Sequence, residues 1–376
     1  MSTIHWLGAG LSSVPGIRRL AASGRPFVLW NRTLSKARAA LPEGSGDARE
    51  LNWSGLTAVV QPGDVIVSML PADLHQRVAG LCLQSESHFV CSSYVSPAME
   101  ALDAEARANG LRFVSEVGLD PGIDHLMAHV LMADYKASGV MNPAHEHHFC
   151  SYCGGFPSQP NDFRYKFSWS PLGVLRALKT PARWIEDGAE ATTEKPWQAL
   201  SSYTVNLPGG EETFQAYPNR DSIPFAEPYG FNAEFNLQTF VRGTLRLDGW
   251  AEAWKEIFAV VDSRATGEDE LKRLSDKLWK QHAYGPDESD RVILHVELTV
   301  TDGGQPVWSG AFALDEHGDE TGSAMARLVS KTVSIAVEAV LDGDLPPGVS
   351  AAPSDSLTAD AWMARLIASG EGIVRS

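Results

Sequence analysis

The sequence predicts an α/β protein, in which a doubly wound parallel sheet is followed by an α+β domain inserted before the closing helices. Three observations support this architecture. Short apolar runs alternate with helical patterns in the first third of the chain, as in a parallel sheet covered by helices. A glycine-containing turn, Gly8-Ala9-Gly10, lies between the first strand and the first helix. Beyond Gly122, longer aromatic-rich strand patterns follow one another across tight turns, which is typical of a mixed or antiparallel sheet.

The first part of the chain supplies the elements of the parallel sheet. Strands are expected at Ile4–Leu7, Phe27–Trp30, Val65–Leu70, Phe89–Cys91 and Arg112–Ser115. Helices are expected at Val14–Ser23 and Ala98–Asn109. Buried parallel strands carry near-continuous apolar runs, and the strand patterns fit that description. We therefore expect residues 1–123, with about 323–376 closing the fold, to form a nucleotide-binding domain.

The second part, residues 124–322, reads as the α+β domain. Its strands are expected at His147–Tyr152, Tyr203–Leu207, Thr213–Tyr217, Glu234–Leu247 and Val292–Thr301. Its helices are expected at His125–Met132 and Trp254–His282, and those of the closing segment at Ser323–Leu341 and Ala359–Ala368. The segment Asp344–Asp355 is rich in Pro, Gly, Ser and Ala and is expected to be a loop.

Composition narrows the classes of partner. The 376 residues are 44% hydrophobic and 21% charged, with a formal net charge of −16, which argues against nucleic acid or an anionic membrane as the main partner. No apolar run is long enough to span a bilayer, and the N-terminus lacks the pattern of a secretory signal. Four cysteines in this length are no disulfide framework, so we expect a cytoplasmic protein.

The turn after the first strand is a candidate phosphate loop of the Rossmann type. Gly8 would make the tight turn, and Gly10 would let the backbone approach a pyrophosphate at the helix N-terminus. The candidate cofactor contacts in this loop are Gly8, Ala9, Gly10, Leu11 and Ser12. A third small residue usually follows, and Ser13 stands there instead of glycine or alanine.

The end of the second strand indicates the cofactor. Dinucleotide sites for NAD usually have a carboxylate there, whereas this chain has Asn31-Arg32-Thr33. Arg32 can stack on adenine and pair with a 2′-phosphate, so NADP(H) is expected rather than NAD(H); the alternative is a surface arginine before a helix. The expected strand Val65–Leu70 ends with Ser68, Met69 and Leu70. In such folds this strand end lines the nicotinamide side of the crevice. The alternative is that these residues form an ordinary strand end.

Metal sites are not expected. Cys150-x-x-Cys153 has the spacing of half a zinc site or a redox pair, but no second such pair exists. The cluster His145–His148 lies in a strand pattern, where adjacent side chains face opposite ways. His125 and His129 have helical spacing but lack the glutamate of a zinc protease.

A longer set of motifs resembles the saccharopine reductases, the saccharopine dehydrogenases that form glutamate. Ser115–His125 carries this resemblance most specifically, with the sequence Ser-Glu-Val-Gly-Leu-Asp-Pro-Gly-Ile-Asp-His. Further matching motifs follow in the same order along the chain: Ser92–Ala98, Ser151–Pro157, Tyr165–Ser170, Tyr217–Ser222 and Arg242–Arg246. Several independent motifs in register are more specific than the glycine loop alone.

The resemblance implies an NADP(H)-dependent oxidoreductase of lysine metabolism. Such an enzyme interconverts saccharopine with L-glutamate and 2-aminoadipate 6-semialdehyde through an imine. The alternatives are a sister enzyme, such as a carboxynorspermidine or lysine dehydrogenase, and a non-catalytic NADP-binding regulator. The family also suggests a homodimer through the second domain.

The resemblance also implies residue roles. The substrate has three carboxylates, and the planar fork of an arginine suits a carboxylate best. Arg220 and Arg246 lie in matching motifs and are therefore candidate carboxylate ligands. The alternative for each is an ordinary surface charge in contact with water. Arg242 shares a strand face with Arg246 and is the structural candidate. The implied substrate contacts are Ser93, Tyr94, Asp120, Arg220, Thr244, Leu245 and Arg246, and those near the reacting carbon are Asp120, Tyr94 and Cys153. The further implied cofactor contacts are Ser92, Val117, Gly118, Leu119 and Ser170.

Two aspartates in one motif are assigned different roles. Asp120 follows a predicted strand, where it would hold the substrate amine or move protons, although it could instead cap the next helix. Asp124 stands directly before the helix body and fits the capping role better. None of Asp120, Tyr94 and Cys153 is expected to be an essential acid or base, because imine reduction depends mainly on positioning.

Overall fold

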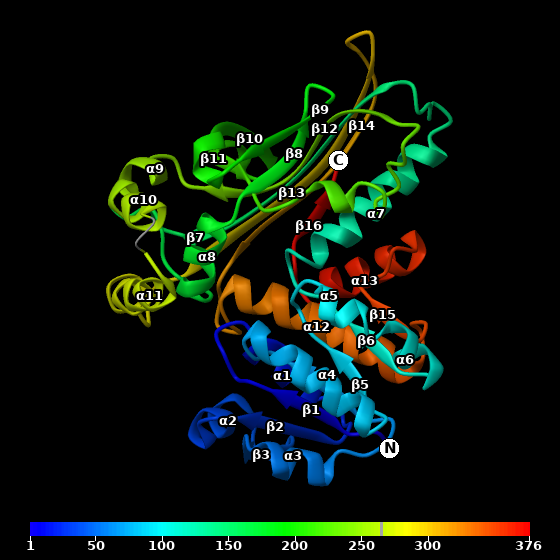
Figure 1. The fold of residues 1–376 in the computed structure, drawn as a ribbon, viewed down its shortest axis with the longest axis vertical. Helices are drawn as coiled ribbons and strands as arrows, with labels where there is room; N and C mark the ends of the chain where they lie inside the picture. Colours follow the sequence, from blue (N-terminus) through cyan, green and yellow to red (C-terminus); the bar gives the residue numbers. More distant parts are fainter. Residues whose placement is uncertain (264–265) are drawn as a thin grey trace. The chain divides into compact units, whose positions relative to one another are not determined.

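The structure, a computed structural model, describes residues 1–263 and 266–376. The chain divides into two compact units (Figure 1). Unit 1 comprises residues 1–126 and 326–369, and unit 2 comprises residues 127–325 and 370–376. Each unit has its own sheet.

Unit 1 contains a seven-stranded parallel sheet. Its strands are β1 (Ile4–Leu7), β2 (Phe27–Asn31), β3 (Asp47–Glu50), β4 (Val65–Ser68), β5 (His88–Val90), β6 (Arg112–Val114) and β15 (Gly348–Ser350). The order is β15-β6-β5-β4-β1-β2-β3, so the chain changes direction across the sheet between β1 and β4. In doubly wound sheets a ligand crevice lies at the carboxyl ends of the strands at this switch point.

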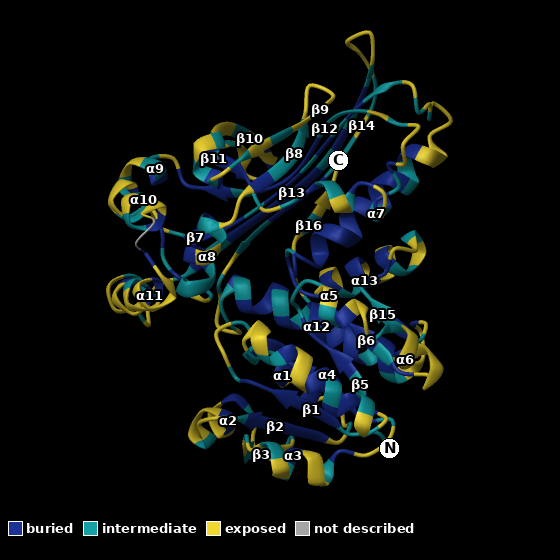
Figure 2. Cartoon of the chain, viewed as in Figure 1, coloured by how far each residue is buried: buried dark blue, intermediate teal, exposed yellow. Residues whose placement is uncertain are grey.

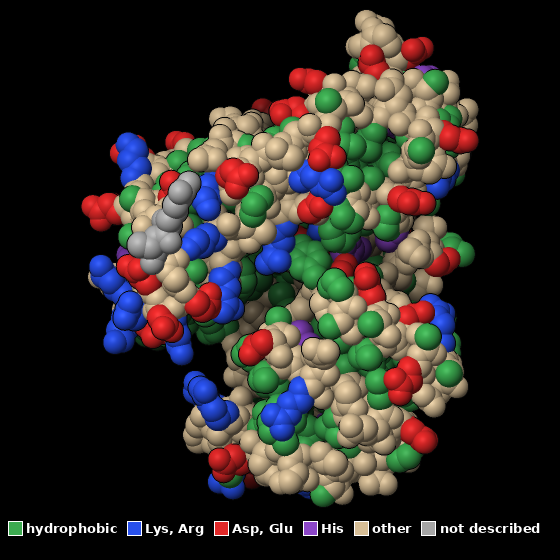
Figure 3. Space-filling view, viewed as in Figure 1, with side chains coloured by type: hydrophobic (Ala, Val, Ile, Leu, Met, Phe, Trp, Pro, Cys, Tyr) green, Lys and Arg blue, Asp and Glu red, His purple; other side chains and the backbone are tan. Residues whose placement is uncertain are grey.

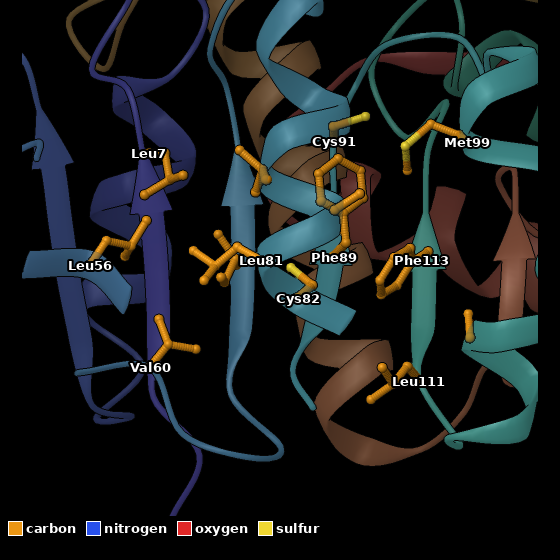
Figure 4. Close-up of a cluster of buried hydrophobic side chains, with 14 of the residues drawn as sticks. Leu7, Leu56, Val60, Leu81, Cys82, Phe89, Cys91, Met99, Leu111 and Phe113 are labelled. Atoms are coloured by element: carbon orange, nitrogen blue, oxygen red, sulfur yellow. The ribbon is translucent and has the colours of Figure 1, made fainter. Parts of the chain in front are cut away.

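The helices of unit 1 bury the faces of this sheet. They are α1 (Val14–Ala21), α2 (Leu34–Ala40), α3 (Trp53–Val59), α4 (His75–Gln84), α5 (Pro97–Glu100), α6 (Asp103–Ala108), α13 (Ser356–Ala368) and most of α12 (Ala324–Asp342). One core cluster joins Leu7, Phe89 and Phe113 of the sheet side to Leu56 and Cys82 of the helices (Figure 4). Because these side chains are fully buried, they stabilise the sheet from which the loops of the crevice emerge.

Unit 2 contains a nine-stranded mixed sheet. Its strands are β7 (Glu146–Pro157), β8 (Ala182–Glu186), β9 (Ala189–Thr193), β10 (Ser201–Leu207), β11 (Gly210–Pro218), β12 (Asn236–Arg246), β13 (Asp290–Asp302), β14 (Gln305–His317) and β16 (Ile373–Arg375). The main path is β10-β11-β12-β7-β13-β14-β16, and β8 pairs with β12 and β9. Only β12 and β7 pair in parallel among these described strands.

The helices of unit 2 are shorter on the whole and partly exposed. They are α8 (Pro171–Lys179), α9 (Trp250–Ala253), α10 (Lys255–Asp262) and α11 (Glu268–His282), while α7 (Ile123–Ala137) begins in unit 1 and continues into unit 2. The central strands of both sheets are buried, and the outer faces of α10 and α11 are exposed (Figure 2).

This architecture confirms the predicted fold class, a doubly wound parallel sheet with a mixed α+β region inserted before the closing helices. Three local predictions were wrong. The expected helix Ala98–Asn109 is divided into α5 and α6. The expected loop Asp344–Asp355 contains β15, which extends the sheet beside β6 because Gly348 N donates to the Leu111 carbonyl at 2.8 Å. The expected helix Trp254–His282 is divided into α10 and α11, and its residues 264–265 lie outside the described part of the chain.

The domain boundaries also differ from expectation at the C-terminus. The segment expected to close the parallel sheet, about 323–376, contributes its last residues to unit 2. There β16 pairs with β14, with Ile373 opposite Leu314. This pairing covers an edge that β14 would otherwise leave open.

The surface carries charges of both signs. Figure 3 shows acidic and basic side chains interspersed over the visible face, in keeping with the net charge of −16. Within the described residues, no helix has the length and hydropathy needed to cross a bilayer.

Candidate active site

The loop between β1 and α1 depends on glycine at its first position. Gly8 has a φ of +101°, and a Cβ there would lie 2.7 Å from the carbonyl oxygen of Met69. Its backbone N–H donates to the Trp30 carbonyl at 2.8 Å. The close approach therefore fixes the loop against the ends of β2 and β4, and another residue would force backbone movement.

The outer part of the same loop is open. Gly10 is exposed, and a Cβ there would meet no atom within 4 Å. Leu11 is 48% exposed, and Ser12 is half-buried. The residue before α1, Ser13, forms no side-chain cap with the helix. In the first turn of α1, Pro15 has no N–H and Gly16 N donates to Ser330 Oγ. An anion such as a phosphate would therefore bind the N–H of Val14 and those of the open loop before it.

Close helix packing, the usual purpose of the third glycine in such loops, occurs at Gly16 rather than at Ser13. Ser13 is buried, whereas Gly16 lies against α12, where any Cβ would overlap the Ser330 backbone. Gly16 N donates to Ser330 Oγ at 2.7 Å. The unusual serine is therefore compatible with the fold, because the contact that requires glycine is three residues further on.

The end of β2 connects to the phosphate loop through Asn31. Its Oδ1 accepts from Ala9 N at 3.1 Å, and its Nδ2 donates to the Thr33 carbonyl at 2.9 Å. Arg32 is exposed, and no described residue engages its guanidinium in a hydrogen bond or ion pair. Arg32 is thus accessible beside the loop, with no protein carboxylate competing for it.

The ends of β4 and β5 are linked by a histidine that sequence reasoning missed. Ser68 Oγ lies 2.9 Å from His75 Nδ1, and Ser93 Oγ lies 2.9 Å from His75 Nε2. Burial lowers the pKa of His75 to about 4, although Asp73 acts in the opposite direction. The imidazole is therefore neutral at physiological pH. Next to this bridge, Ser92 Oγ donates to the Met69 sulfur at 3.8 Å.

The loops after β5 and β6 bring Tyr94 and Asp120 together. The Tyr94 hydroxyl donates to Asp120 Oδ1 at 3.4 Å. Glu116 supports this arrangement from a left-handed backbone conformation with a φ of +56°. Its Oε1 accepts from Val95 N at 2.8 Å, and its Oε2 lies 2.8 Å from His125 Nε2. These two predicted site residues therefore lie within one hydrogen-bonded group of loops.

The segment leading to Asp120 is buried. Val117 is 0% exposed and Leu119 is 3% exposed, so their side chains belong to the core, and their backbone groups are the parts suited to a cofactor. Gly118 is also buried, and a Cβ there would lie 3.0 Å from that of Ser92. Asp124 is in the first turn of α7, where its Oδ1 accepts from Gly122 N at 2.7 Å. This contact agrees with its expected structural role.

In unit 2, Arg246 at the end of β12 is enclosed by aromatic rings. Its guanidinium carbon lies 5.0 Å from the ring centre of Tyr165, 5.3 Å from Trp250 and 5.4 Å from Tyr217. The residue is 6% exposed. Its Nη1 donates to the Leu245 carbonyl at 3.1 Å, but its buried Nε has no partner, and no described carboxylate pairs with it.

A buried cation without an anion is costly, so this arrangement is suited to receive an anionic ligand. The rings supply cation–π attraction, but they leave the fork of the guanidinium without a carboxylate. Burial raises the pKa of Tyr217, although the guanidinium acts to lower it, so the phenol is neutral at physiological pH.

The other predicted residues of unit 2 have different environments. Leu245 is fully buried in the sheet core, on the face opposite Thr244 and Arg246. Arg220 is exposed in the loop after β11, with a φ of +60°. Ser170 is exposed, and its Oγ accepts from Gly173 N at 3.2 Å, which caps α8. Cys153 is half-buried on β7 next to Gly154.

Comparison with known proteins bears on both units. Residues 4–114 match the family model described as "Saccharopine dehydrogenase NADP binding domain", and residues 118–371 match "Saccharopine dehydrogenase C-terminal domain". A "Saccharopine dehydrogenase [NADP(+), L-glutamate-forming]" from Pyricularia oryzae is 31% identical, with 97% of this chain and 96% of that protein aligned. The chain belongs to the saccharopine dehydrogenase family.

Solved structures agree with this family membership. The "Apo histidine-tagged saccharopine dehydrogenase (L-Glu forming)" from Saccharomyces cerevisiae superposes with a TM-score of 0.81 at 28% identity, covering 100% of this chain and 99% of the yeast chain. A homospermidine synthase from Legionella pneumophila in complex with NAD has a TM-score of 0.64 at 10% identity, covering 100% and 91% of the two chains. The second likeness shows that the fold is shared more widely than the sequence.

In this family member, the sequence-predicted residues therefore fall into two groups. Unit 1, which includes the NADP-binding domain, holds the phosphate loop, Arg32 and the loops that carry Ser93, Tyr94 and Asp120. Unit 2 holds Arg246 in its aromatic enclosure, together with Thr244, Cys153 and Arg220. Sequence reasoning gave no role in the site to five residues that the structure places there: His75, Gly16, Glu116, Tyr217 and Trp250. His75 begins a helix seven residues after Ser68, and no sequence motif marks it.

The two cysteines with metal-site spacing, Cys150 and Cys153, do not form half of a metal site. Cys150 and Cys153 are three apart on strand β7, so their side chains face opposite sides of the sheet. Both are free cysteines. Within the described ranges, no group of three or more His, Cys, Asp and Glu side chains is arranged to hold a metal ion.

Proposed function

We propose that this chain is an NADP(H)-dependent saccharopine dehydrogenase of the glutamate-forming type. In one direction, saccharopine loses a hydride from the CH2 on the lysine side of its secondary nitrogen and a proton from that nitrogen, and the resulting imine takes up water and separates into L-glutamate and 2-aminoadipate 6-semialdehyde. In the other direction, the aldehyde and the amine condense and the imine is reduced. Family membership and about 30% identity over nearly the whole chain support this assignment.

One structural observation carries the proposal furthest. Arg246 is a buried cation in an aromatic enclosure, and no carboxylate of the described residues pairs with it. A substrate carboxylate would supply the missing charge and accept from the unpartnered Nε. The arginine fork also matches carboxylate geometry better than a lysine would.

The cofactor residues of unit 1 fit NADP(H). The open backbone at Gly10, the uncapped start of α1 and the accessible guanidinium of Arg32 suit a pyrophosphate and a 2′-phosphate. Ala9, Leu11, Ser12, Asn31 and Thr33 complete that contact in our proposal. When bound, the nicotinamide supplies or accepts the hydride.

The nicotinamide side is assigned to three further loops. We assign it the residues at the ends of β4, β5 and β6: Ser68, Met69, Leu70, Ser92, Val117, Gly118 and Leu119, and we add Ser170 of unit 2. The buried segment after β6 would contribute backbone groups, because its side chains are in the core.

The substrate residues act by binding and orientation. Tyr94 and Asp120, joined at 3.4 Å, would hold the substrate nitrogen and the proton that it gains or loses. The hydroxyl groups of Ser93 and Thr244 and the N–H of Leu245 would donate hydrogen bonds to carboxylates, and Arg220 would attract a second carboxylate. Cys153 would lie near the reacting carbon.

Absorbance at the nicotinamide band tests the proposal directly. Purified protein with saccharopine and NADP should form NADPH, while lysine as the control substrate should not. Turnover of lysine without saccharopine would instead identify a sister dehydrogenase. NADPH binding without turnover of any of these substrates would identify a regulator.

We further propose a cytoplasmic homodimer. Four free cysteines are in keeping with a reducing compartment. On β14, Ser309 and Ala311 present small, accessible side chains on the same face as Cys150, and a second sheet can approach such a face closely. Light scattering coupled to size exclusion would give a mass of about twice 40.7 kDa; the mass of a single chain would contradict the dimer.

A further inference from the structure

We infer that His75 is a positioning residue, whose imidazole ties the Ser93 hydroxyl to Ser68 and so fixes the direction in which Ser93 can bond a substrate. The inference rests on the proposed function, which places Ser93 at the substrate. Nothing in the sequence motifs pointed to His75.

The geometry of the bridge is specific. Both ring nitrogens of His75 lie 2.9 Å from a serine Oγ, that of Ser68 at the end of β4 and that of Ser93 on the loop after β5. His75 is 6% exposed and Ser68 is 1% exposed. The ring of Phe89 contacts the imidazole edge-on, at 6.1 Å between centres, which restricts rotation of the ring. The imidazole is therefore held from three sides.

The bridge orders the two hydroxyl groups because the ring is neutral. A neutral imidazole has one N–H and one lone pair, so one serine must accept from the ring and the other must donate to it. Burial, which lowers the pKa of His75 to about 4, prevents the doubly protonated form in which both nitrogens donate. The serine that donates to the ring can then only accept from a ligand, whereas the serine that accepts from the ring keeps its own proton for a ligand.

The position of the Ser93 side chain depends on the hydrogen bond to His75 more than that of a closely packed core serine would. Its carbonyl accepts from Glu116 N at 2.9 Å, which fixes the backbone. Its hydroxyl has His75 as its partner among the described residues. Behind the segment lies a cavity of about 160 Å³, lined by His75, Ser93 and Tyr94 among others. Because packing does not hold the side chain there, the hydrogen bond to His75 determines its position.

Two amide substitutions separate the two halves of the bridge. In His75→Gln, the amide reaches the position of Nε2 and retains the contact with Ser93. In His75→Asn, the shorter amide replaces Nδ1 and retains only Ser68. We expect the KM for saccharopine to stay within about twofold in His75→Gln and to rise about five- to tenfold in His75→Asn, the loss of one hydrogen bond. Nicotinamide fluorescence should show NADPH affinity within about twofold in both variants.

His88 provides a matched control. It is also a histidine whose pKa burial lowers to about 4, but it begins β5 at the opposite end of the strand from Ser93, and its Nδ1 accepts from Arg112 N at 3.0 Å. His88→Gln and His88→Asn should each lower the thermal midpoint of unfolding, and the KM for saccharopine should be unchanged in both variants. Equal rises in KM for the two His75 variants, or a lowered midpoint with unchanged KM, would overturn the inference.

A readout without turnover distinguishes this inference from the proposed function. Nitrogen-15 spectra of the histidine rings should show a single neutral tautomer of His75 between pH 5 and 8, and Ser93→Ala should shift its Nε2 resonance. If saccharopine is not turned over by the unaltered enzyme, the proposed function fails while the spectra still report on the bridge. An averaged or charged ring would refute the bridge itself.

Discussion

Replacing Arg246 tests the substrate site and distinguishes binding from structural support. In Arg246→Met, a chain of similar length keeps the packing between the rings but removes the cation. In Arg246→Lys, the charge remains, but the planar fork and its stacking are lost. Because the guanidinium is 6% exposed and lacks a carboxylate partner in the described protein, the two effects can be separated.

The expected magnitudes follow from this burial. A charge-assisted hydrogen-bonded pair that is removed costs about 1.5 to 3 kcal/mol. At 1.36 kcal/mol for each tenfold change, kcat/KM for saccharopine should fall by about 10- to 150-fold in Arg246→Met. The kcat/KM of Arg246→Lys should lie between those of the unaltered enzyme and Arg246→Met. The free energy of unfolding without substrate should stay unchanged or rise, because the substitution removes a buried charge that no protein anion compensates.

The assay combines initial rates with thermal unfolding, and Arg291 supplies the control. Arg291 is also in unit 2, but its guanidinium forms two hydrogen bonds of 2.7 Å with Asp315 and an ion pair of 2.8 Å with Glu212. Arg291→Met should therefore lower the midpoint while leaving the KM for saccharopine unchanged. If Arg246→Met unfolds at a much lower temperature and retains its KM, then Arg246 is structural and the reasoning is wrong.

Three further predictions concern unit 1. Arg32→Asp should reverse the preference for NADP over NAD by at least about 30-fold in kcat/KM, because it replaces a phosphate partner with a like charge; an unchanged ratio would show that Arg32 does not touch the 2′-phosphate. Gly10→Ala should leave the thermal midpoint unchanged, since no atom lies within 4 Å of the new Cβ, yet weaken NADPH binding measured by fluorescence; unchanged affinity would remove Gly10 from the site. Burial acts to raise the pKa of Asp64, but hydrogen bonds from His5 and the backbone outweigh it and hold the pKa below its usual 3.8. The stability contributed by Asp64 should thus be present above about pH 4 and be lost as the pH falls through the folded pKa, so Asp64→Asn should flatten the acid limb of the unfolding curve; an unaltered limb would contradict this.

The parallel sheet was predictable because its signals are local. Runs such as Val65–Ser68 are buried on both faces and are read directly as strands. β3 (Asp47–Glu50) escaped notice because its four residues are polar or small and lie at the sheet edge. β15 escaped notice because it has three residues in a stretch rich in Pro and Gly. Such short edge strands depend on partners distant in sequence, which periodicity does not reveal.

The cofactor loop was predictable in part because its sequence signals are also local. The roles of Gly8 and Gly10 follow from backbone conformation, which the local sequence determines. Ser13 looked like a departure from the pattern only because the packing partner was unknown. The partner is Ser330 on α12, more than 300 residues away, and it meets the helix at Gly16. A contact over that separation leaves no mark in a fifteen-residue window.

The substrate side shows the limit of sequence reasoning most clearly. Alternation along β12 places Arg242 and Arg246 on one face, and nothing in the sequence separates their environments. The structure does, since Arg242 lies over the ring of Phe225 at 4.0 Å, whereas Arg246 lies among the rings of Tyr165, Tyr217 and Trp250. Those three rings come from separate segments, so the enclosure exists only after the sheet and α9 have formed. Specificity for a carboxylate is therefore a tertiary property here, in contrast to phosphate binding, which one loop and one helix end can provide.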